Sequence, residues 1–98
     1  MGENQHAILV ALNAIPEGHV TSYSGVAKRA GLTAGYARLV CRVLRELPDR
    51  HQTPWWRVVR ADGHSAMSAA SAGGAEQRRR LKTEGVVFKG DKVMGPWW

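Results

Sequence analysis

Few side chains in this sequence have the type and spacing that covalent or metal chemistry needs. None of the serines lies in a nucleophile-elbow pattern, no two carboxylates have a useful spacing, and no glycine-rich phosphate loop is present. The single cysteine, Cys41, lies among apolar neighbours, which favours a buried small hydrophobe over a reactive thiolate. The four histidines are scattered without the spacing of metal ligands. We therefore expect no catalytic residue, no metal and no cofactor.

The charge of the chain points to a polyanionic partner. Its 98 residues carry 14 Lys and Arg against 8 Asp and Glu, a formal net charge of +6, and the pI is about 10.3. This excess favours nucleic acid first and an anionic membrane second. The length allows one small domain, 1–98. The apolar run at residues 7–12 is too short to span a bilayer and follows no basic stretch, so we expect a cytoplasmic protein without a membrane partner.

A basic face is predicted on a helix between Thr33 and about Leu47. Arg38, Arg42 and Arg45 are spaced four and three residues apart, so they line up on one side of this helix. The opposite side is an apolar stripe suited to packing, made of Leu39, Val40, Val43, Leu44 and Leu47. Most basic helix faces are simply solvated, and this one is either solvated or a surface that contacts DNA.

The segment before this helix favours DNA contact. Thr21 or Ser22 can cap a short helix that runs to about Ala30, and Gly31 then supplies a sharp turn. Pro48 ends the helix that follows the turn. This spacing predicts a helix-turn-helix, a unit whose second helix enters a groove of DNA.

The remaining segments predict a mainly α fold with a small β-hairpin, arranged as a winged helix-turn-helix domain. They are a helix over residues 7–15, a strand-like run over 55–60, a turn at 61–63, a mobile surface loop over 64–74, a helix over 75–84, and a hairpin of residues 86–88 and 92–94.

Residues 53–59 read Thr-Pro-Trp-Trp-Arg-Val-Val and follow the predicted helix-turn-helix. The other informative stretches are, in order, residues 18–23 (Gly-His-Val-Thr-Ser-Tyr), the pair Ala37-Arg38, the pair Gly73-Gly74, and residues 81–85. In these stretches the sequence resembles the C-terminal domain of the O6-alkylguanine-DNA alkyltransferases, which carry Pro-Cys-His-Arg-Val where this chain has Pro-Trp-Trp-Arg-Val. Each stretch alone is a weak signal, but together and in order they are specific, and the similarity extends from about residue 8 to residue 87.

One departure from that family decides the expected function. Family members use the cysteine as a thiolate that takes the alkyl group, and the neighbouring histidine helps to deprotonate it. Here Trp55 stands at the cysteine position and Trp56 at the histidine position. Indole offers no nucleophilic lone pair and does not titrate near neutral pH, so both halves of the reaction are missing. Glu84, which matches the acid at the end of the family's proton relay, has nothing to relay.

The chain is thus similar to the alkyltransferase-like proteins, which carry Trp in place of the cysteine. Those proteins bind the DNA minor groove and rotate the damaged guanine out of the stack. By this resemblance Tyr23 pushes on the flipped nucleotide and Arg38 fills the vacated stack, since a planar cation can stack on bases. The implied lesion pocket comprises Tyr23, Trp55, Val58, Ser71 and Ala72, with residues 64–74 as its lid. The implied DNA-binding residues are Thr21, Ser22, Tyr23, Thr33, Ala34, Arg38 and Arg42.

The resemblance predicts a non-enzymatic, monomeric sensor of O6-alkylguanine in double-stranded DNA that flags lesions for nucleotide excision repair. Two alternatives remain open, a residual alkyltransferase that uses Cys41 and a winged-helix transcription regulator that reads sequence. Trp56 either packs in the core or lines the pocket. Trp97 and Trp98, beyond the similar region, either cover the domain or leave an apolar patch for a partner.

Overall fold

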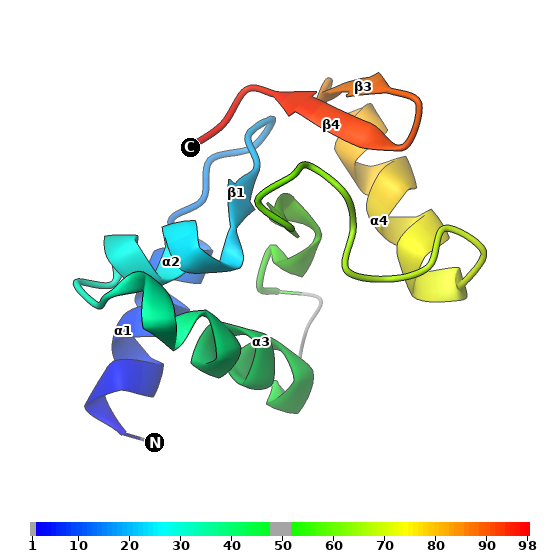
Figure 1. The fold of residues 1–98 in the computed structure, drawn as a ribbon. Coiled ribbons are helices and arrows are strands. Elements are labelled where there is room, and N and C mark those ends of the chain that lie inside the picture. Colours follow the sequence, from blue (N-terminus) through cyan, green and yellow to red (C-terminus); the bar gives the residue numbers. More distant parts are fainter. Residues whose placement is uncertain (1, 48–51) are drawn as a thin grey trace.

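Helices are the predominant regular elements of the computed structural model, which describes residues 2–47 and 52–98 (Figure 1). The helices are α1 (Glu3–Asn13), α2 (Tyr23–Arg29), α3 (Ala37–Glu46) and α4 (Ala72–Thr83), with short 3₁₀ helices at Ala34–Tyr36 and Trp55–Arg57. The strands are β1 (Thr21–Ser22), β2 (Val58–Val59), β3 (Val87–Lys89) and β4 (Lys92–Gly95). The predicted fold class, mainly α with a small antiparallel hairpin, is confirmed. Among the described residues, no helix is long and apolar enough to cross a bilayer.

Helices α2 and α3 form the predicted helix-turn-helix. Ser22 caps α2, because its hydroxyl accepts a hydrogen bond of 3.0 Å from the backbone N–H of Gly25. Gly31 turns the chain with φ at +82°, a conformation that a β-carbon would strain. Helix α3 starts at Ala37, later than predicted, because the preceding turn is wound as a 3₁₀ helix. Pro48, the predicted end of this helix, lies outside the described residues, and Glu46 is the last helical residue before it.

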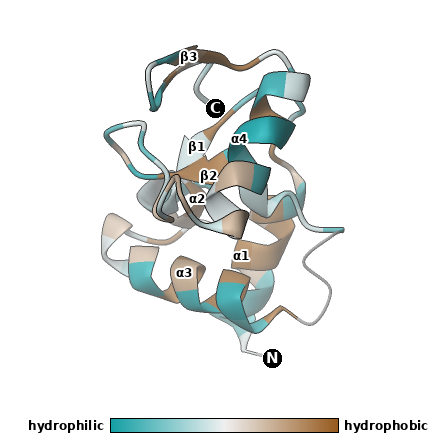
Figure 2. Cartoon of the chain, turned by 90° about the vertical axis from the view of Figure 1, so that its right-hand side faces the viewer, coloured by the Kyte–Doolittle hydropathy of each residue, from teal (hydrophilic) through white to brown (hydrophobic). Residues whose placement is uncertain are grey.

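A first core cluster joins α1, α2 and α3. The apolar stripe of α3 is confirmed, because Val40, Val43 and Leu44 are buried and Leu39 and Leu47 are partly buried against the same cluster. The other members are Ile8, Ala11, Leu12, Ile15, Val26, Ala27, Trp55 and Val58. Figure 2 shows this amphipathic pattern on α3, where hydrophobic and hydrophilic positions alternate along the helix. Burial of this stripe, rather than helix propensity, holds so short a helix in place.

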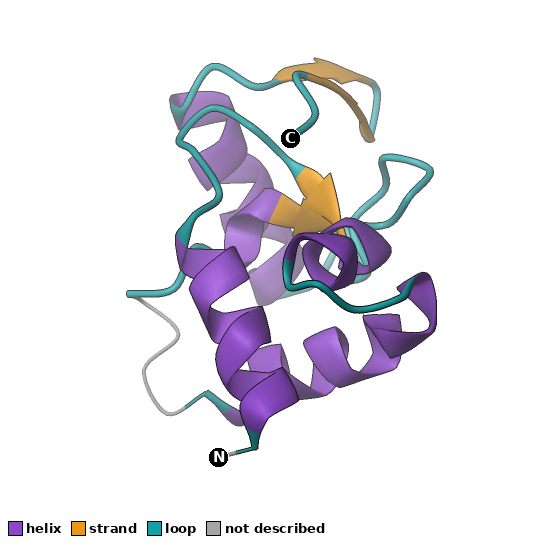
Figure 3. Ribbon diagram, turned by 90° about the vertical axis from the view of Figure 1, so that its left-hand side faces the viewer, coloured by secondary structure: helices purple, strands orange, loops and turns teal. Residues whose placement is uncertain are grey.

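A small parallel sheet, absent from the predictions, crosses the middle of the molecule (Figure 3). Strand β1 pairs with β2, with Thr21 opposite Val58. The predicted strand over residues 55–60 is therefore wrong for its first half, which is wound as a 3₁₀ helix, and right for β2. Val20, immediately before β1, pairs with Trp97 in an isolated parallel bridge, so the chain end lies beside the start of β1.

The chain end, residues 96–98, lies along Val20. The N–H of Val20 donates to the Pro96 carbonyl (3.0 Å), and the N–H of Trp98 donates to the Val20 carbonyl (2.8 Å). The indole of Trp98 packs on the first core cluster beneath the guanidinium of Arg29, 3.9 Å from the ring centre. Trp98 therefore covers the fold, whereas Trp97 is 44% exposed.

Helix α4 and the β3–β4 hairpin form the second part of the fold. A second core cluster lies between them and the central sheet and comprises Val20, Val59, Leu81, Val86 and Val93. The hairpin is antiparallel, with Phe88 opposite Val93, as predicted. Helix α4 starts at Ala72 and not at the predicted residue 75. The two glycines at 73 and 74 look like loop composition, but they lie within the first turn of the helix.

Candidate nucleic-acid interface

The three predicted arginines form an exposed basic face on α3. Arg38, Arg42 and Arg45 are all exposed, opposite the buried stripe of the same helix. Arg42 lies 3.6 Å from Glu46, but both side chains are more than half exposed, so this ion pair holds the guanidinium only weakly. A cationic helix face of this kind is available to phosphate groups.

The other predicted DNA-binding residues lie at the start of each helix of the pair. Thr33 and Ala34 are exposed before α3, and Ser22 and Tyr23 are partly buried at the start of α2. Thr21 differs from them, since it is 2% exposed. Its side chain is therefore buried in the protein, and only Ser22 and Tyr23, at the start of α2, are accessible for contact in this segment.

The two tryptophans form an aromatic pair in the turn that precedes β2. Trp55 is only 9% exposed, and its ring lies edge-on to that of Trp56 with 6.1 Å between centroids. Trp56 is partly buried beneath the guanidinium of Arg80, 4.6 Å from its ring, and Arg57 lies 5.2 Å from the same ring. Trp56 thus packs within the fold and contacts Trp55 on one side.

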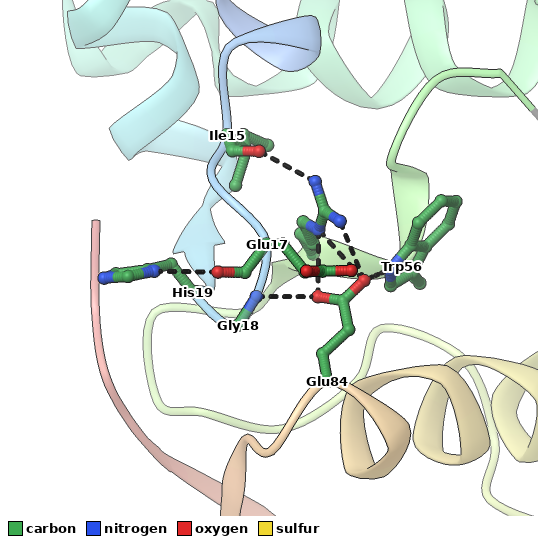
Figure 4. A network of polar contacts seen from close by, with 7 residues as sticks. Ile15, Glu17, Gly18, His19, Trp56 and Glu84 are labelled. Atoms are coloured by element: carbon green, nitrogen blue, oxygen red, sulfur yellow. Dashed lines mark hydrogen bonds and ion pairs between the residues drawn. The ribbon is translucent and has the colours of Figure 1, made fainter.

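Glu84, at the end of α4, fixes this turn to the rest of the fold (Figure 4). Its carboxylate accepts hydrogen bonds from the Trp56 indole (2.8 Å), from the Arg57 guanidinium (2.8 Å at the shortest) and from the backbone N–H of Gly18 (2.9 Å). Arg57 also donates to the Ile15 carbonyl (2.8 Å). The network joins α4, the segment after α1 and the tryptophan turn. The sequence analysis predicted no role for Glu84, whereas in the structure its carboxylate joins these three segments.

The Glu84 carboxylate is ionised in this environment. The side chains of Arg57 and Glu84 are 14% and 9% exposed. Burial raises the pKa of Glu84, but the hydrogen bonds from Arg57, Gly18 and Trp56 and the charge of Arg57 outweigh burial and lower the pKa below its ordinary 4.5. The buried ion pair is therefore intact at neutral pH.

Gln77 of α4 is a second link to the turn, and the sequence analysis missed it. Its side chain is 2% exposed, and its amide nitrogen donates to the carbonyls of Trp56 (3.1 Å) and Val58 (2.9 Å). Its amide oxygen accepts from the hydroxyl of Ser65. The N–H of Val58 is bound to the Trp55 carbonyl. A guanine edge that bonds to Val58 would therefore share its carbonyl with Gln77, through the second lone pair.

The position of Gln77 on its helix was a usable signal. It lies three residues after Gly74 and four before Leu81, and all three are buried. Residues with this spacing share one face of a helix. A glutamine on such a face predicts a buried amide that must find partners.

The predicted lid is shorter than expected, because residues 72–74 belong to α4. The lid segment is therefore residues 64–71. Its end is fixed by Ser71, whose hydroxyl accepts from the N–H of Gly74 (3.0 Å) and donates to the Ser68 carbonyl (2.6 Å). A β-carbon on Gly74 would lie 2.1 Å from that carbonyl oxygen, so only glycine allows this approach. Ser71 and Ala72 are exposed at the start of α4.

The structure brings part of the predicted lesion pocket together. Trp55 and Val58 belong to the first core cluster, and Tyr23 packs against it. Met67, a lid residue that the sequence analysis did not single out, packs against the same cluster. The pocket residues therefore divide into an inner group of three and an exposed pair, Ser71 and Ala72, at the α4 end of the lid.

Comparison with known protein families gives one match that covers most of the chain. The family described as the 6-O-methylguanine DNA methyltransferase, DNA binding domain, matches residues 3–86. A "DNA base-flipping protein" of Escherichia coli (strain K12) is 44% identical over 77 residues, which is 79% of this chain and 57% of that protein. A "Methylated-DNA--protein-cysteine methyltransferase" of Methanothermobacter thermautotrophicus is 35% identical over 89 residues, 90% of this chain and 47% of that protein. The chain thus spans about half the length of these relatives.

Solved structures with a similar fold include Schizosaccharomyces pombe Atl1. The structure of "S. pombe Atl1 in complex with damaged DNA containing O6-carboxymethylguanine" superposes with a TM-score of 0.76 at 30% sequence identity. The match covers 95% of this chain and 87% of the other.

Proposed function

The chain belongs to the family of the 6-O-methylguanine DNA methyltransferase DNA-binding domains, as an alkyltransferase-like protein, and on this premise we propose that it recognises O6-alkylguanine in double-stranded DNA without removing the alkyl group. The names of two relatives support the proposal, since one flips DNA bases and the other was solved with damaged DNA. A third relative is named as a methyltransferase, so the proposal that alkyl transfer is absent rests on this chain's own residues.

The observation that carries the proposal is the pair of indoles at the tryptophan turn. By the family resemblance Trp55 stands where the alkyl-accepting cysteine would be, and Trp56 stands where its histidine would be. The Trp56 indole donates to Glu84, so the acid that would end a proton relay is occupied by a group that cannot pass a proton on. Trp55 offers an apolar aromatic wall and no nucleophile.

Recognition would proceed by base flipping. The basic face of α3 meets the phosphates, Arg38 enters the stack, and the modified guanine rotates toward Tyr23 and Trp55. Flipping costs a few kcal/mol and costs less for a poorly paired base, which favours alkylated guanine over guanine. The protein acts as a monomer in the cytoplasm, and the marked site passes to nucleotide excision repair.

A paired binding and mass measurement tests this function. Fluorescence anisotropy at fixed salt compares two matched duplexes, one with a single O6-methylguanine and one undamaged. We expect tighter binding to the modified duplex, and intact mass spectrometry afterwards should find the methyl group still on the DNA. Trp55→Ala should reduce the preference for the modified duplex. Trp97→Ala, which changes an exposed indole in the chain end, should not reduce it.

Each rival function gives a different result in the same experiment. An alkyltransferase that uses Cys41 of α3 would add a methyl mass to the protein, and Cys41→Ser would abolish that addition. A transcription regulator would bind both duplexes equally and prefer certain sequences. Either result would overturn the proposal.

A further inference from the structure

A cavity of about 270 Å³ lies beside the lid segment, on the side of α4 and the hairpin. Its apolar walls include Val59, Leu81, Phe88 and Val93, and the lid contributes Met67 and Ala69 to its lining. None of the five predicted pocket residues lines this cavity. It is therefore a space separate from the one expected at Trp55.

Met67 borders both spaces. Its side chain packs against the core cluster that contains Trp55, and it also lines the cavity. Its sulfur touches the start of α4, where a β-carbon on Gly73 would lie 2.8 Å away. Methionine has three rotatable bonds and no branches, so it changes rotamer more easily than any other large apolar side chain.

The backbone on either side of Met67 is anchored, which leaves the side chain as the part that can move. Ser65 donates to the buried amide of Gln77 and accepts from the N–H of Met67 (3.0 Å). Beyond Met67, the N–H and hydroxyl of Ser71 both bond to the Ser68 carbonyl. A rotation of the Met67 side chain would break none of these hydrogen bonds.

We propose that Met67 is a movable wall of the lesion pocket and determines which O6-alkyl groups fit, by turning into the adjoining cavity when the group is large. The inference rests on the proposed function. A small O6-methyl group leaves Met67 against the Trp55 cluster, whereas an O6-benzyl group displaces it. The cavity of about 270 Å³ has room for the end of the Met67 side chain, and its lining combines apolar side chains with the charged Arg78 and Asp91.

The test fills the cavity without touching the pocket. Ala69→Leu places a larger side chain in the cavity lining. Ala70→Leu is its matched control, because both alanines are exposed and only Ala69 lines the cavity. Anisotropy measures affinity for duplexes that carry O6-methylguanine, O6-benzylguanine or no lesion. We expect Ala69→Leu to weaken O6-benzylguanine binding by about fivefold or more and O6-methylguanine binding by less than about twofold. Ala70→Leu should change neither.

A double mutant separates the movable wall from a general effect on the lid. Met67→Ala removes the side chain that needs the space, so Met67→Ala/Ala69→Leu should regain the O6-benzylguanine binding that Ala69→Leu alone loses. Equal losses for both lesions in Ala69→Leu, or no recovery in the double mutant, would overturn the role of Met67. If the unmodified protein binds all three duplexes equally, the proposed function itself fails, and this result is distinct from the other two.

Discussion

At the scale of single residues, Glu84 connects separate segments of the fold through its buried carboxylate. A carboxylate that is 9% exposed is costly to bury unless its lone pairs are satisfied. Here Arg57, Trp56 and Gly18 supply the donors. The satisfied carboxylate therefore holds the tryptophan turn in place.

This arrangement predicts a pH-dependent loss of stability. Glu84→Gln leaves Arg57 buried without its counter-ion, and we expect the free energy of unfolding at pH 7 to fall by about 3 kcal/mol. Because the pKa of Glu84 is lowered from 4.5, its contribution is complete above that pH and is lost as the pH falls through the lowered pKa. Urea denaturation from pH 7 to pH 3 should show the difference between the two proteins narrowing only below about pH 4.5.

The control for this prediction is Glu46→Gln. It removes a carboxylate from an exposed ion pair on α3, so the free energy of unfolding should change by less than about 0.5 kcal/mol. A difference between Glu84→Gln and the unmodified protein that stays constant down to pH 3 would contradict the role of the ionised carboxylate.

At the scale of elements, the start of α3 is where DNA binding should be concentrated. Arg38 lies in the first turn of the helix and is exposed, whereas Lys89 is exposed at the tip of the hairpin. We expect Arg38→Ala to weaken binding to an O6-methylguanine duplex by about tenfold and Lys89→Ala by about twofold at most. An arginine finger, a side chain that fills the vacated position in the base stack, contributes more to affinity than a single phosphate contact does. Anisotropy titrations measure both, and equal losses would argue against a finger at Arg38.

The junction of the lid segment with α4 gives a second prediction at this scale. In Gly74→Ala the β-carbon would collide with the Ser68 carbonyl, so the lid must move from the helix, and we expect a loss of about 2 kcal/mol in unfolding free energy. Gly35→Ala is the matched control, since its β-carbon would meet only an ordinary contact at 3.6 Å. Thermal unfolding compares them, and equal midpoints would show that the lid does not pack on α4 as described.

Local signals explain which elements were predictable from the sequence. The turn at Gly31 and the apolar stripe of α3 act within a few residues and were predicted correctly. The cap of α2 is Ser22, one of the two residues that the sequence analysis offered. The hairpin is equally local. The start of α4 was misplaced because Gly73-Gly74 is typical of loops, and only the close approach of Ser68, a tertiary contact, explains glycine inside the helix.

Long-range contacts account for what the sequence did not predict. Strands β1 and β2 are two residues each and pair across more than 30 positions, so they have no alternation to detect. Glu84, Gln77 and Met67 act on residues that the fold alone brings near. The family resemblance singles out Trp55, Tyr23 and Arg38 as candidate site residues, but it does not indicate what fixes the tryptophan turn or what lies behind the lid segment.

At the scale of the whole molecule, two core clusters meet at one side chain. Trp56 packs against the cluster of the helix-turn-helix and against the cluster beneath α4 and the hairpin. Its indole also bonds to Glu84 at the end of α4. The half that would meet DNA and the half that carries the lid are thus joined through the residue next to Trp55, so a change at the pocket can reach both.

The net charge of +6 predicts strong salt dependence of DNA binding. If about four phosphates are neutralised, log affinity should fall against log salt with a slope of about −3.6. Replacement of one arginine of the α3 face, Arg42→Ala, should reduce the slope by about 0.9 if that residue meets a phosphate. Anisotropy over a range of potassium chloride concentrations measures the slope, and a flat response would contradict a phosphate-binding surface.

Lesion recognition by this protein, as proposed, requires that the modified guanine leaves the duplex. The fluorescence of 2-aminopurine placed next to a single O6-methylguanine reports this step, because 2-aminopurine brightens when its stacked neighbour leaves. We predict that fluorescence rises in step with binding of the protein and that an undamaged duplex shows a much smaller rise. Saturated binding to the modified duplex with no rise in fluorescence would contradict the claim, because the guanine would then have remained in its stack.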